Sequence, residues 1–265
     1  MSRFLKVPAF ACWFALLFSA AASHAQAPDW KKIRVAVEGA YPPFSEIGAD
    51  GKIKGFEIDI VNELCARMKA ECTLVQLEFD GMIPALQARK IDVIFASMAI
   101  TEKRQKVIAF SAPYINNPAR LAAKAGVRFD FTAAGLKGKR IGVQRSTIHE
   151  AFVTKTFTQS EIVRYATQDQ IFLDLKAGRL DLILADGVAI DQGFLSRPDG
   201  KGFAFAGPEY NDPSVFGIGS GAGMRKPDAP SLAPKFNAAI KAVMADGTYK
   251  KINDRYFPYS IMPKP

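Results

Sequence analysis

Short apolar runs alternate with helical patterns along this chain, and the alternation occurs twice. The expected elements of the first half are strands at 33–37, 73–77 and 91–95 and helices at 57–69 and 81–88. Those of the second half are strands at 140–143, 162–165 and 180–184 and helices at 147–156 and 169–177. Strand–helix alternation is typical of parallel sheets covered by helices. The sequence therefore predicts an α/β protein with two similar lobes, each a mostly parallel sheet flanked by helices.

A charged residue follows the third strand of each half. The segment ARKIDVIFAS leads to Arg104, and the similar segment AGRLDLILAD ends at Asp186. Ligands of open parallel sheets bind beyond the carboxyl ends of the strands, and an arginine there offers a planar fork for a carboxylate. The alternatives are a solvated arginine and an aspartate that caps a helix. We expect Arg104 and Asp186 at comparable positions of two lobes that face each other.

The N-terminus has the three parts of a secretory signal peptide. Arg3 and Lys6 precede an apolar core at 7–22, and small residues follow it up to Ala25. The core is shorter than the roughly 20 residues that a membrane-spanning helix needs. We therefore predict a signal peptide at 1–25 and a periplasmic location for the mature chain.

The charge of the chain does not indicate a nucleic-acid partner. The formal net charge of +9 falls to +7 when the signal peptide removes two basic residues. The remaining lysines and arginines are interleaved with acidic residues and form no clustered stripe of the kind that nucleic-acid binders carry.

Two cysteines, Cys65 and Cys72, lie in the mature chain. Export places them in an oxidising compartment, where a disulfide is the default expectation. No metal site or cofactor is expected, because His149 is the one histidine after the signal peptide and no CxxC spacing exists. The helical pattern around His149 predicts that this residue lies on the helix surface.

The C-terminal tail at 231–257 holds two helical stretches separated by the turn Asp246-Gly247. We expect this tail to pack back on the first lobe, so that the chain crosses between the lobes twice. The predicted first lobe comprises residues 28–116 and 213–265, and the predicted second lobe comprises residues 117–212.

Several segments, in order along nearly all of the mature chain, resemble one protein family. They read GFEIDIVNELCARM, FDGMIP, ITEKRQKVIAFSAPY, LKGKRIGVQ, AGRLDLILAD and ADGTYKKINDRYF. The chain is similar to the periplasmic amino-acid-binding proteins of ABC importers (solute-binding protein family 3), of the lysine/arginine/ornithine- and histidine-binding type. The resemblance implies a type II periplasmic binding protein fold with two lobes joined by two crossover strands. It also implies a monomer that delivers one amino acid to an inner-membrane ABC permease.

The resemblance assigns roles to residues that match the family pattern. It implies that Arg104 clamps the α-carboxylate of the ligand and that Asp186 takes the α-ammonium. Thr147, after Gln144 in the segment GVQRSTIHE, falls at a helix N-terminus, which favours an anion. The register of Ser146 to Ile148 against the family stays open by one position.

Other positions imply how the side chain of the ligand is held. Tyr41 and Phe79 match the two aromatics that sandwich it, and aromatic faces attract cations. Glu38 stands where this type carries an aspartate that reaches the distal cation. The turn residues Ala96, Ser97 and Ala99 complete the expected site, with alanines at 96 and 99 where the relatives have serines.

Two other functions stay open at this point. The segment EGAYPPF also resembles opine-binding proteins, so an opine is an alternative ligand. An exported dehydratase of the cyclohexadienyl type is the enzyme alternative, with Glu38 or Asp186 as general acid. The sequence contains no Ser–His–Asp or Cys–His arrangement and no glycine-rich phosphate loop, so we expect a binding protein and not an enzyme.

Overall fold

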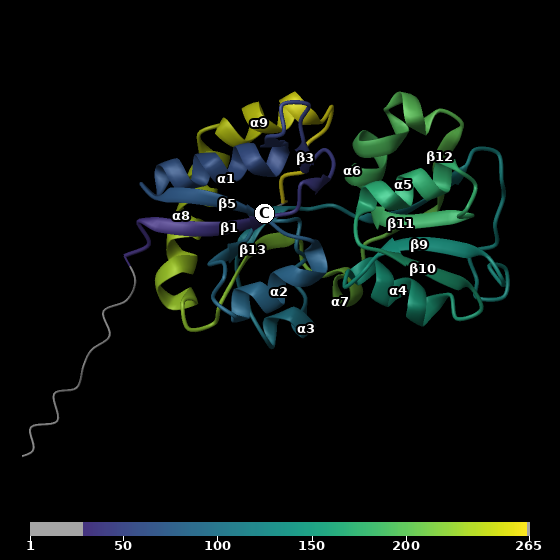
Figure 1. The fold of residues 1–265 in the computed structure, drawn as a ribbon, viewed down its shortest axis with the longest axis horizontal. Helices are drawn as coiled ribbons and strands as arrows, with labels where there is room; N and C mark the ends of the chain where they lie inside the picture. Colours follow the sequence, from purple (N-terminus) through teal and green to yellow (C-terminus); the bar gives the residue numbers. More distant parts are fainter. Residues whose placement is uncertain (1–28, 264–265) are drawn as a thin grey trace, which may run out of the picture.

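The chain forms two α/β lobes that lie side by side, each built around its own five-stranded sheet (Figure 1). The structure is a computed structural model, and it describes residues 29–263. The predicted signal peptide at 1–25 lies outside the described residues.

The sheet of the first lobe has the strand order β5-β1-β6-β13-β7. Its strands are β1 (Lys32–Val37), β5 (Glu71–Gln76), β6 (Val93–Ile94), β7 (Ala109–Ile115) and β13 (Ser220–Met224). β1 pairs in parallel with β5 and β6, whereas β13 runs antiparallel to β6 and β7. The three predicted strands are confirmed, but β13 and β7 extend the sheet and β13 runs antiparallel to the other four strands, so the sheet is mixed.

The sheet of the second lobe repeats this plan with the order β10-β9-β11-β8-β12. Its strands are β8 (Ala119–Lys124), β9 (Arg140–Gln144), β10 (Glu161–Tyr165), β11 (Leu182–Asp186) and β12 (Phe203–Tyr210). β9 pairs in parallel with β10 and β11, and β8 is antiparallel to β11 and β12. The two lobes therefore place the carboxyl ends of their parallel strands at equivalent edges.

Helices cover both sheets. In the first lobe they are α1 (Phe56–Arg67), α2 (Phe79–Gln87), α3 (Glu102–Gln105), α8 (Ala229–Ala245) and α9 (Thr248–Tyr256). From β9 to β13 they are α4 (Ile148–Thr156), α5 (Gln168–Lys176), α6 (Gly187–Ile190) and α7 (Pro213–Phe216), with a π-helical turn at Asp191–Leu195 and a 3₁₀ turn at Pro198–Gly200. A small sheet of β2 (Ala40–Tyr41), β3 (Ser45–Ile47) and β4 (Ile53–Lys54) follows β1.

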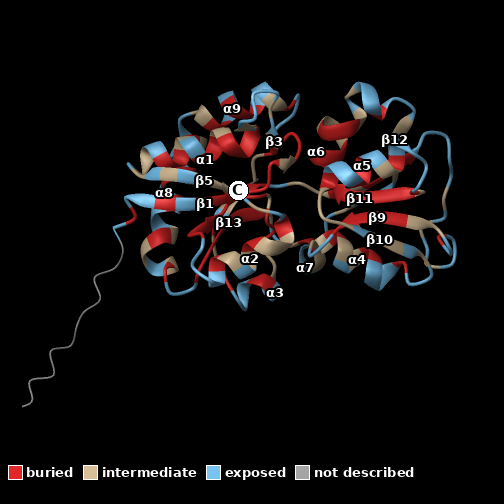
Figure 2. Cartoon of the chain, in the orientation of Figure 1, coloured by how far each residue is buried: buried red, intermediate tan, exposed pale blue. Residues whose placement is uncertain are grey.

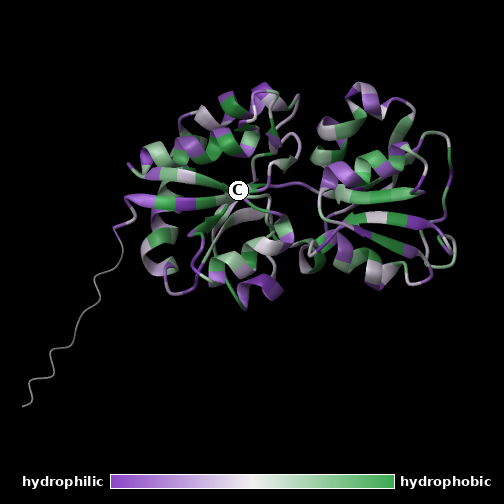
Figure 3. Ribbon diagram, in the orientation of Figure 1, coloured by the Kyte–Doolittle hydropathy of each residue, from purple (hydrophilic) through white to green (hydrophobic). Residues whose placement is uncertain are grey.

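Apolar side chains at helical spacing pack these helices against the sheets. In α1, Ile58, Val61 and Leu64 recur every three residues and are buried in the core of the first lobe. Figure 2 shows the buried residues concentrated in the sheets and on the inner helix faces, and Figure 3 shows hydrophobic residues along β11 at the centre of the second lobe. Burial of these faces supplies the main driving force for each lobe.

The chain crosses between the lobes twice, as expected. Residues 116–118 connect β7 to β8, and the return from β12 to β13 passes through α7. The C-terminal helices then contact the first lobe, since α8 packs on β7 and α1 and α9 packs on α1. Phe216 of α7 packs in the core of the second lobe, so the return crossing follows this helix.

The predicted disulfide is confirmed, because Cys65 and Cys72 are bonded and their Cα atoms are 6.1 Å apart. The bond connects the last turn of α1 to the first residues of β5. It fixes the connection between the first helix and the edge strand of the sheet.

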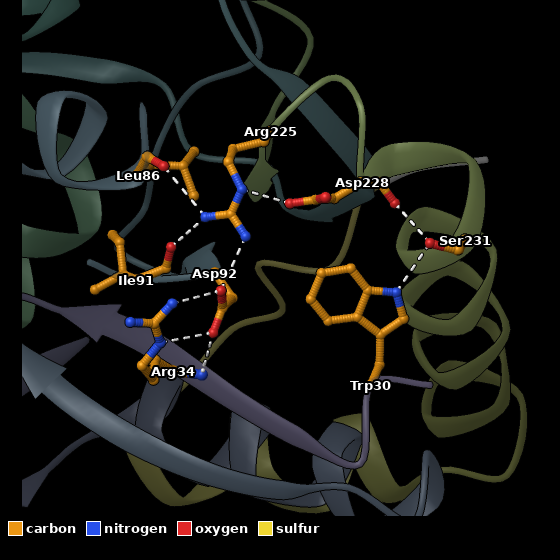
Figure 4. Close-up of polar contacts among 8 residues, drawn as sticks. All are labelled: Trp30, Arg34, Leu86, Ile91, Asp92, Arg225, Asp228 and Ser231. Atoms are coloured by element: carbon orange, nitrogen blue, oxygen red, sulfur yellow. Dashed lines mark hydrogen bonds and ion pairs between the residues drawn. The ribbon is translucent and has the colours of Figure 1, made fainter. Parts of the chain in front are cut away.

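A buried charge network holds the amino ends of β1 and β6 (Figure 4). Asp92 accepts hydrogen bonds from the backbone N–H of Arg34 at 3.0 Å and from its Nε at 2.9 Å, and Arg225 Nη2 donates to Asp92 at 2.9 Å. Arg225 also donates to Asp228, and the Nε1 of Trp30 donates to Ser231 at 2.9 Å. The network thus joins the first strand to the segment that leads from β13 into α8. It lies near the amino ends of β1 and β6, opposite the carboxyl ends at which the two lobes face each other.

We predict that Asp92→Asn lowers the free energy of unfolding by about 2 kcal/mol at neutral pH and leaves ligand affinity unchanged. Burial alone would raise the pKa of Asp92, but hydrogen bonds from Arg34 and Arg225 lower it to about 2. The contribution is therefore present above the unfolded pKa near 3.8 and is lost as the pH falls towards 2. Urea denaturation of the wild type and of Asp92→Asn at pH 7 and pH 3 measures this contribution.

The second lobe supplies a matched control for this substitution. Asp181 accepts a hydrogen bond from the backbone N–H of Arg140 at 2.8 Å, as Asp92 does from Arg34, but its side chain is 30 % exposed. Asp181→Asn should therefore cost clearly less stability than Asp92→Asn. Equal losses for the two variants would contradict the role of the buried network.

Candidate functional site

One pocket lies between the lobes, at the carboxyl ends of the parallel strands. Glu38 directly follows β1, the turn at 96–99 follows β6, and Gln144 and Asp186 end β9 and β11. All ten predicted site residues line this pocket, together with two that the sequence did not indicate. The twelve are Glu38, Tyr41, Phe79, Ala96, Ser97, Ala99, Arg104, Gln144, Thr147, Ile148, His149 and Asp186.

Arg104 supplies a buried positive charge to the pocket from the first lobe. It lies in α3, whose N-cap Thr101 accepts the backbone N–H of Arg104, and it is 9 % exposed. Its Nη1 donates to the carbonyl of Ala99 at 3.0 Å and its Nη2 to the carbonyl of Ser146, in the other lobe, at 3.2 Å. Within residues 29–263 no carboxylate lies within 4.0 Å of this guanidinium. A buried guanidinium that is held only by carbonyl groups is suited to an incoming carboxylate.

Burial does not discharge this side chain. It lowers the pKa of Arg104 to about 10, whereas the negative charge of Asp186 acts in the opposite direction. Arg104 therefore remains a cation near neutral pH. The guanidinium also lies over the ring of Phe79, 5.4 Å from its centroid, which holds the two side chains against each other.

Asp186 brings a negative charge into the pocket from the second lobe. Tyr41, from the small sheet of the first lobe, donates its hydroxyl hydrogen to Oδ2 of Asp186 at 2.7 Å. His149 Nε2 lies 3.4 Å from the other oxygen, Oδ1. This contact with Tyr41 links the two lobes through the carboxylate.

Glu38 and Gln144 form a second contact between the lobes. The Nε2 of Gln144 donates to Glu38 at 2.5 Å and to the carbonyl of Ala166 at 3.0 Å. Glu38 is 4 % exposed, and burial raises its pKa to about 8 although the hydrogen bond from Gln144 acts against the shift. Its carboxyl group is therefore largely protonated at pH 7 and would ionise fully beside a cation.

The turn that follows β6 is supported by a buried acid that the sequence did not single out. Glu57 Oε1 accepts hydrogen bonds from the backbone N–H of Ser97 at 2.6 Å, from its hydroxyl at 3.1 Å and from the hydroxyl of Tyr114 at 2.5 Å. Ser97 adopts a left-handed backbone conformation with φ 47°, which is uncommon for a residue with a side chain. Since Ser97 directs both donors to Glu57, this acid fixes the shape of the turn.

We predict that Glu57→Gln removes a pH-dependent loss of stability. Burial raises the pKa of Glu57 to about 7, although hydrogen bonds from Tyr114 and Ser97 lower it, and the ordinary value is 4.5. The stability that protonated Glu57 contributes is complete below pH 4.5 and is lost as the pH rises through 7. The glutamine oxygen can accept the same three hydrogen bonds. Relative to the wild type, the variant should gain about 2 kcal/mol of unfolding free energy between pH 5 and pH 7. Parallel pH profiles in urea denaturation would contradict this.

Thr147 is the N-cap of α4. Its hydroxyl accepts the backbone N–H of Glu150 at 3.1 Å and donates to the carbonyl of Gln144 at 2.7 Å. The helix begins at Ile148, so the backbone N–H groups of its first turn have no acceptor within the helix. This end of the helix lies in the pocket wall, where it favours a negative group.

The prediction for His149 was wrong. His149 was expected on the surface of its helix, but it is 5 % exposed and lines the pocket. It is the second residue of α4, and the first turn of this helix meets the other lobe. Its place two residues after the N-cap of a helix that begins at a strand end is the one sequence signal that could have indicated this position.

Polar contacts outside the pocket also join the lobes. Arg145 Nε lies 3.1 Å from Asp80 and its Nη2 lies 3.5 Å from Glu78. Arg197 Nη2 lies 3.0 Å from Glu46. These contacts flank the pocket, and the side chains of Arg145 and Arg197 that make them are 44 % and 41 % exposed.

Within residues 29–263, no group of three or more His, Cys, Asp or Glu side chains could hold a metal ion. In the same part of the chain, no helix has the length and hydropathy needed to cross a membrane.

Comparisons with known proteins place this geometry in context. The family model described as bacterial extracellular solute-binding proteins, family 3, matches residues 33–259. An L-arginine-binding protein of Pseudomonas aeruginosa is 46 % identical over 233 residues, which cover 87 % of this chain and 90 % of that protein. The lysine/arginine/ornithine-binding periplasmic protein of Escherichia coli is 43 % identical over 247 residues, 92 % of this chain and 94 % of that protein.

A solved structure gives the same result for the fold. A periplasmic binding protein of Salmonella typhimurium, described as having high arginine specificity, superposes with a TM-score of 0.79 at 32 % identity. The match covers 86 % of this chain and 99 % of that one. The two-lobed fold of type II periplasmic binding proteins is thereby confirmed for this chain.

Proposed function

Because this chain belongs to family 3 of the bacterial extracellular solute-binding proteins, we propose that it captures one basic amino acid between its lobes. The ligand is arginine, lysine, ornithine or histidine, and the chain delivers it to an inner-membrane ABC permease. Relatives described as binding L-arginine or lysine, arginine and ornithine support this class of ligand.

One observation carries the proposal: two opposite charges from the two lobes line one buried pocket without pairing with each other. Arg104 and Asp186 are both 9 % exposed, and no ion pair within 4.0 Å joins them among residues 29–263. A free amino acid carries both complementary charges, on an ammonium group and a carboxylate group that are bonded to the same carbon atom. It therefore contacts both lobes at once and favours the closed arrangement over an open one.

The remaining pocket residues select the side chain of the ligand. Tyr41 and Phe79 supply aromatic surface, and Glu38 with Gln144 forms the polar end of the pocket. Ala96, Ser97, Ala99 and Thr147 complete the proposed binding set around the carboxylate and ammonium groups. A cationic end group beside Glu38 gains a charge-assisted hydrogen bond that a neutral side chain does not.

The proposal includes an exported monomer without a cofactor. Its signal peptide at 1–25 is removed, and the mature protein is periplasmic. The first boundary between the lobes stays at 116/117, as predicted. We place the second at the end of α7 and not at 212/213, because Phe216 packs in the core of the second lobe.

Stabilisation by ligands tests the proposed class. Protein that has been unfolded, freed of ligand and refolded is heated with arginine, lysine, ornithine, histidine, glutamine, glutamate or octopine. A ligand that binds the folded state alone raises the melting temperature. We expect shifts for basic amino acids only. A larger shift with octopine would favour an opine, and turnover of prephenate would favour the dehydratase alternative.

A further inference from the structure

His149 lies beside the carboxylate that we propose as the receptor of the ligand's ammonium group. The residue is 5 % exposed, lines the pocket and belongs to the first turn of α4. Its Nε2 atom lies 3.4 Å from Oδ1 of Asp186. Within the described part of the chain, Nε2 has no hydrogen-bond partner.

A buried imidazole nitrogen without a partner costs free energy, so most such groups in proteins are hydrogen bonded. Asp186 offers the missing acceptor, because a carboxylate can accept about four hydrogen bonds and Tyr41 uses Oδ2. A small rotation of the ring or of the carboxylate brings 3.4 Å into the range of an N–H···O bond.

The two neighbours of Asp186 come from different lobes. Tyr41 belongs to β2 of the first lobe and His149 to α4 of the second. Tyr41 then holds Oδ2 from the first lobe, and His149 holds Oδ1 from the second lobe. The remaining acceptor positions of the two oxygens are left for the ligand. A carboxylate fixed in this way loses less conformational freedom when an ammonium group binds.

We propose that His149 is a positioning residue for Asp186: its Nε2–H holds Oδ1 and thereby aims the carboxylate at the α-ammonium group of the ligand. This inference rests on the proposed function for the identity of the ligand. Its specific consequence is that His149 matters for ligands with an α-amino group and not for analogues that lack one.

Calorimetric titration with a pair of ligands tests this consequence. L-Arginine and 5-guanidinopentanoate differ only in the α-amino group. His149→Leu should lower the affinity for L-arginine about tenfold and leave the affinity for 5-guanidinopentanoate nearly unchanged. The preference for L-arginine over this analogue should therefore fall about tenfold. His149→Gln, which retains an N–H donor, should restore most of the preference. Val153→Ala, a core substitution one turn further along α4, should lower the melting temperature and keep the preference.

Equal weakening of both ligands by His149→Leu would overturn the proposal, because it indicates a purely structural role. A separate arm needs no ligand: melting temperatures of His149→Leu, Asp186→Asn and the double variant form a cycle. Non-additive shifts support the contact between the two side chains, and additive shifts overturn it. If wild-type protein binds neither ligand, the proposed function fails, and this cycle still decides the role of His149.

Discussion

Replacing Arg104 by alanine is expected to reduce the affinity for basic amino acids by at least about 1,000-fold, corresponding to about 4 kcal/mol. The guanidinium is buried, is charged near neutral pH and has no carboxylate within 4.0 Å among residues 29–263. The variant removes the partner of the ligand's α-carboxylate from a site that excludes water. That carboxylate would then be buried without a counter-charge, which is the costly outcome.

Arg145→Ala is the matched control for this substitution. Arg145 is also an arginine at the junction of the lobes, but its side chain is 44 % exposed and pairs with Asp80 and Glu78. Exposed pairs of this kind contribute about 0–1 kcal/mol, so the affinity should fall by less than about fivefold. Titration calorimetry measures both variants, and melting temperatures show whether each is folded. Retention of affinity within tenfold in a folded Arg104→Ala variant would contradict the carboxylate clamp.

Glu38→Gln is expected to lower the affinity for arginine by about 100-fold. The affinity for citrulline, the neutral counterpart of arginine, should fall by less than about threefold. Burial raises the pKa of Glu38 to about 8, so the carboxyl group holds a proton in much of the unliganded protein at pH 7. A cationic ligand lowers this pKa, and binding therefore releases a proton. The affinity for arginine should rise between pH 6 and pH 8 in the wild type and stay level in the variant.

Titrations in two buffers with different ionisation enthalpies measure the proton release directly. Glu78→Gln serves as the control, since Glu78 lies near the junction of the lobes but its side chain is 60 % exposed. Its substitution should leave both the selectivity and the proton release as in the wild type. Equal loss of arginine and citrulline in Glu38→Gln would rule out selection by charge.

The sequence pattern predicted the three neighbouring parallel strands of each sheet well and missed the other two strands of each. β1, β5, β9, β10 and β11 are apolar runs between helical patterns, and they lie within one or two residues of the expected bounds. β13 reads SGAGM, and small residues of this kind carry no alternating pattern. β6 is short, at Val93–Ile94, because the longer apolar run bends into the turn that Glu57 holds.

Site residues that directly follow a strand were predictable from the sequence. Residues whose burial depends on contacts with distant parts of the chain were not. Arg104 and Asp186 follow from strand-end positions together with the family resemblance, and the structure brings them into one pocket. His149 and Glu57 were not indicated, because their burial depends on contacts far apart in sequence. His149 is covered where α4 meets the cleft, and Glu57 is covered by the turn at 97 and by Tyr114.

Calorimetric titration of ligand-free mature protein with L-arginine is the most direct test of whether the chain captures one basic amino acid between its lobes. We expect saturable binding of one arginine per chain, with proton release near pH 7 and a preference over citrulline. Absence of binding to arginine and to the other basic amino acids, with the protein folded, would contradict this expectation.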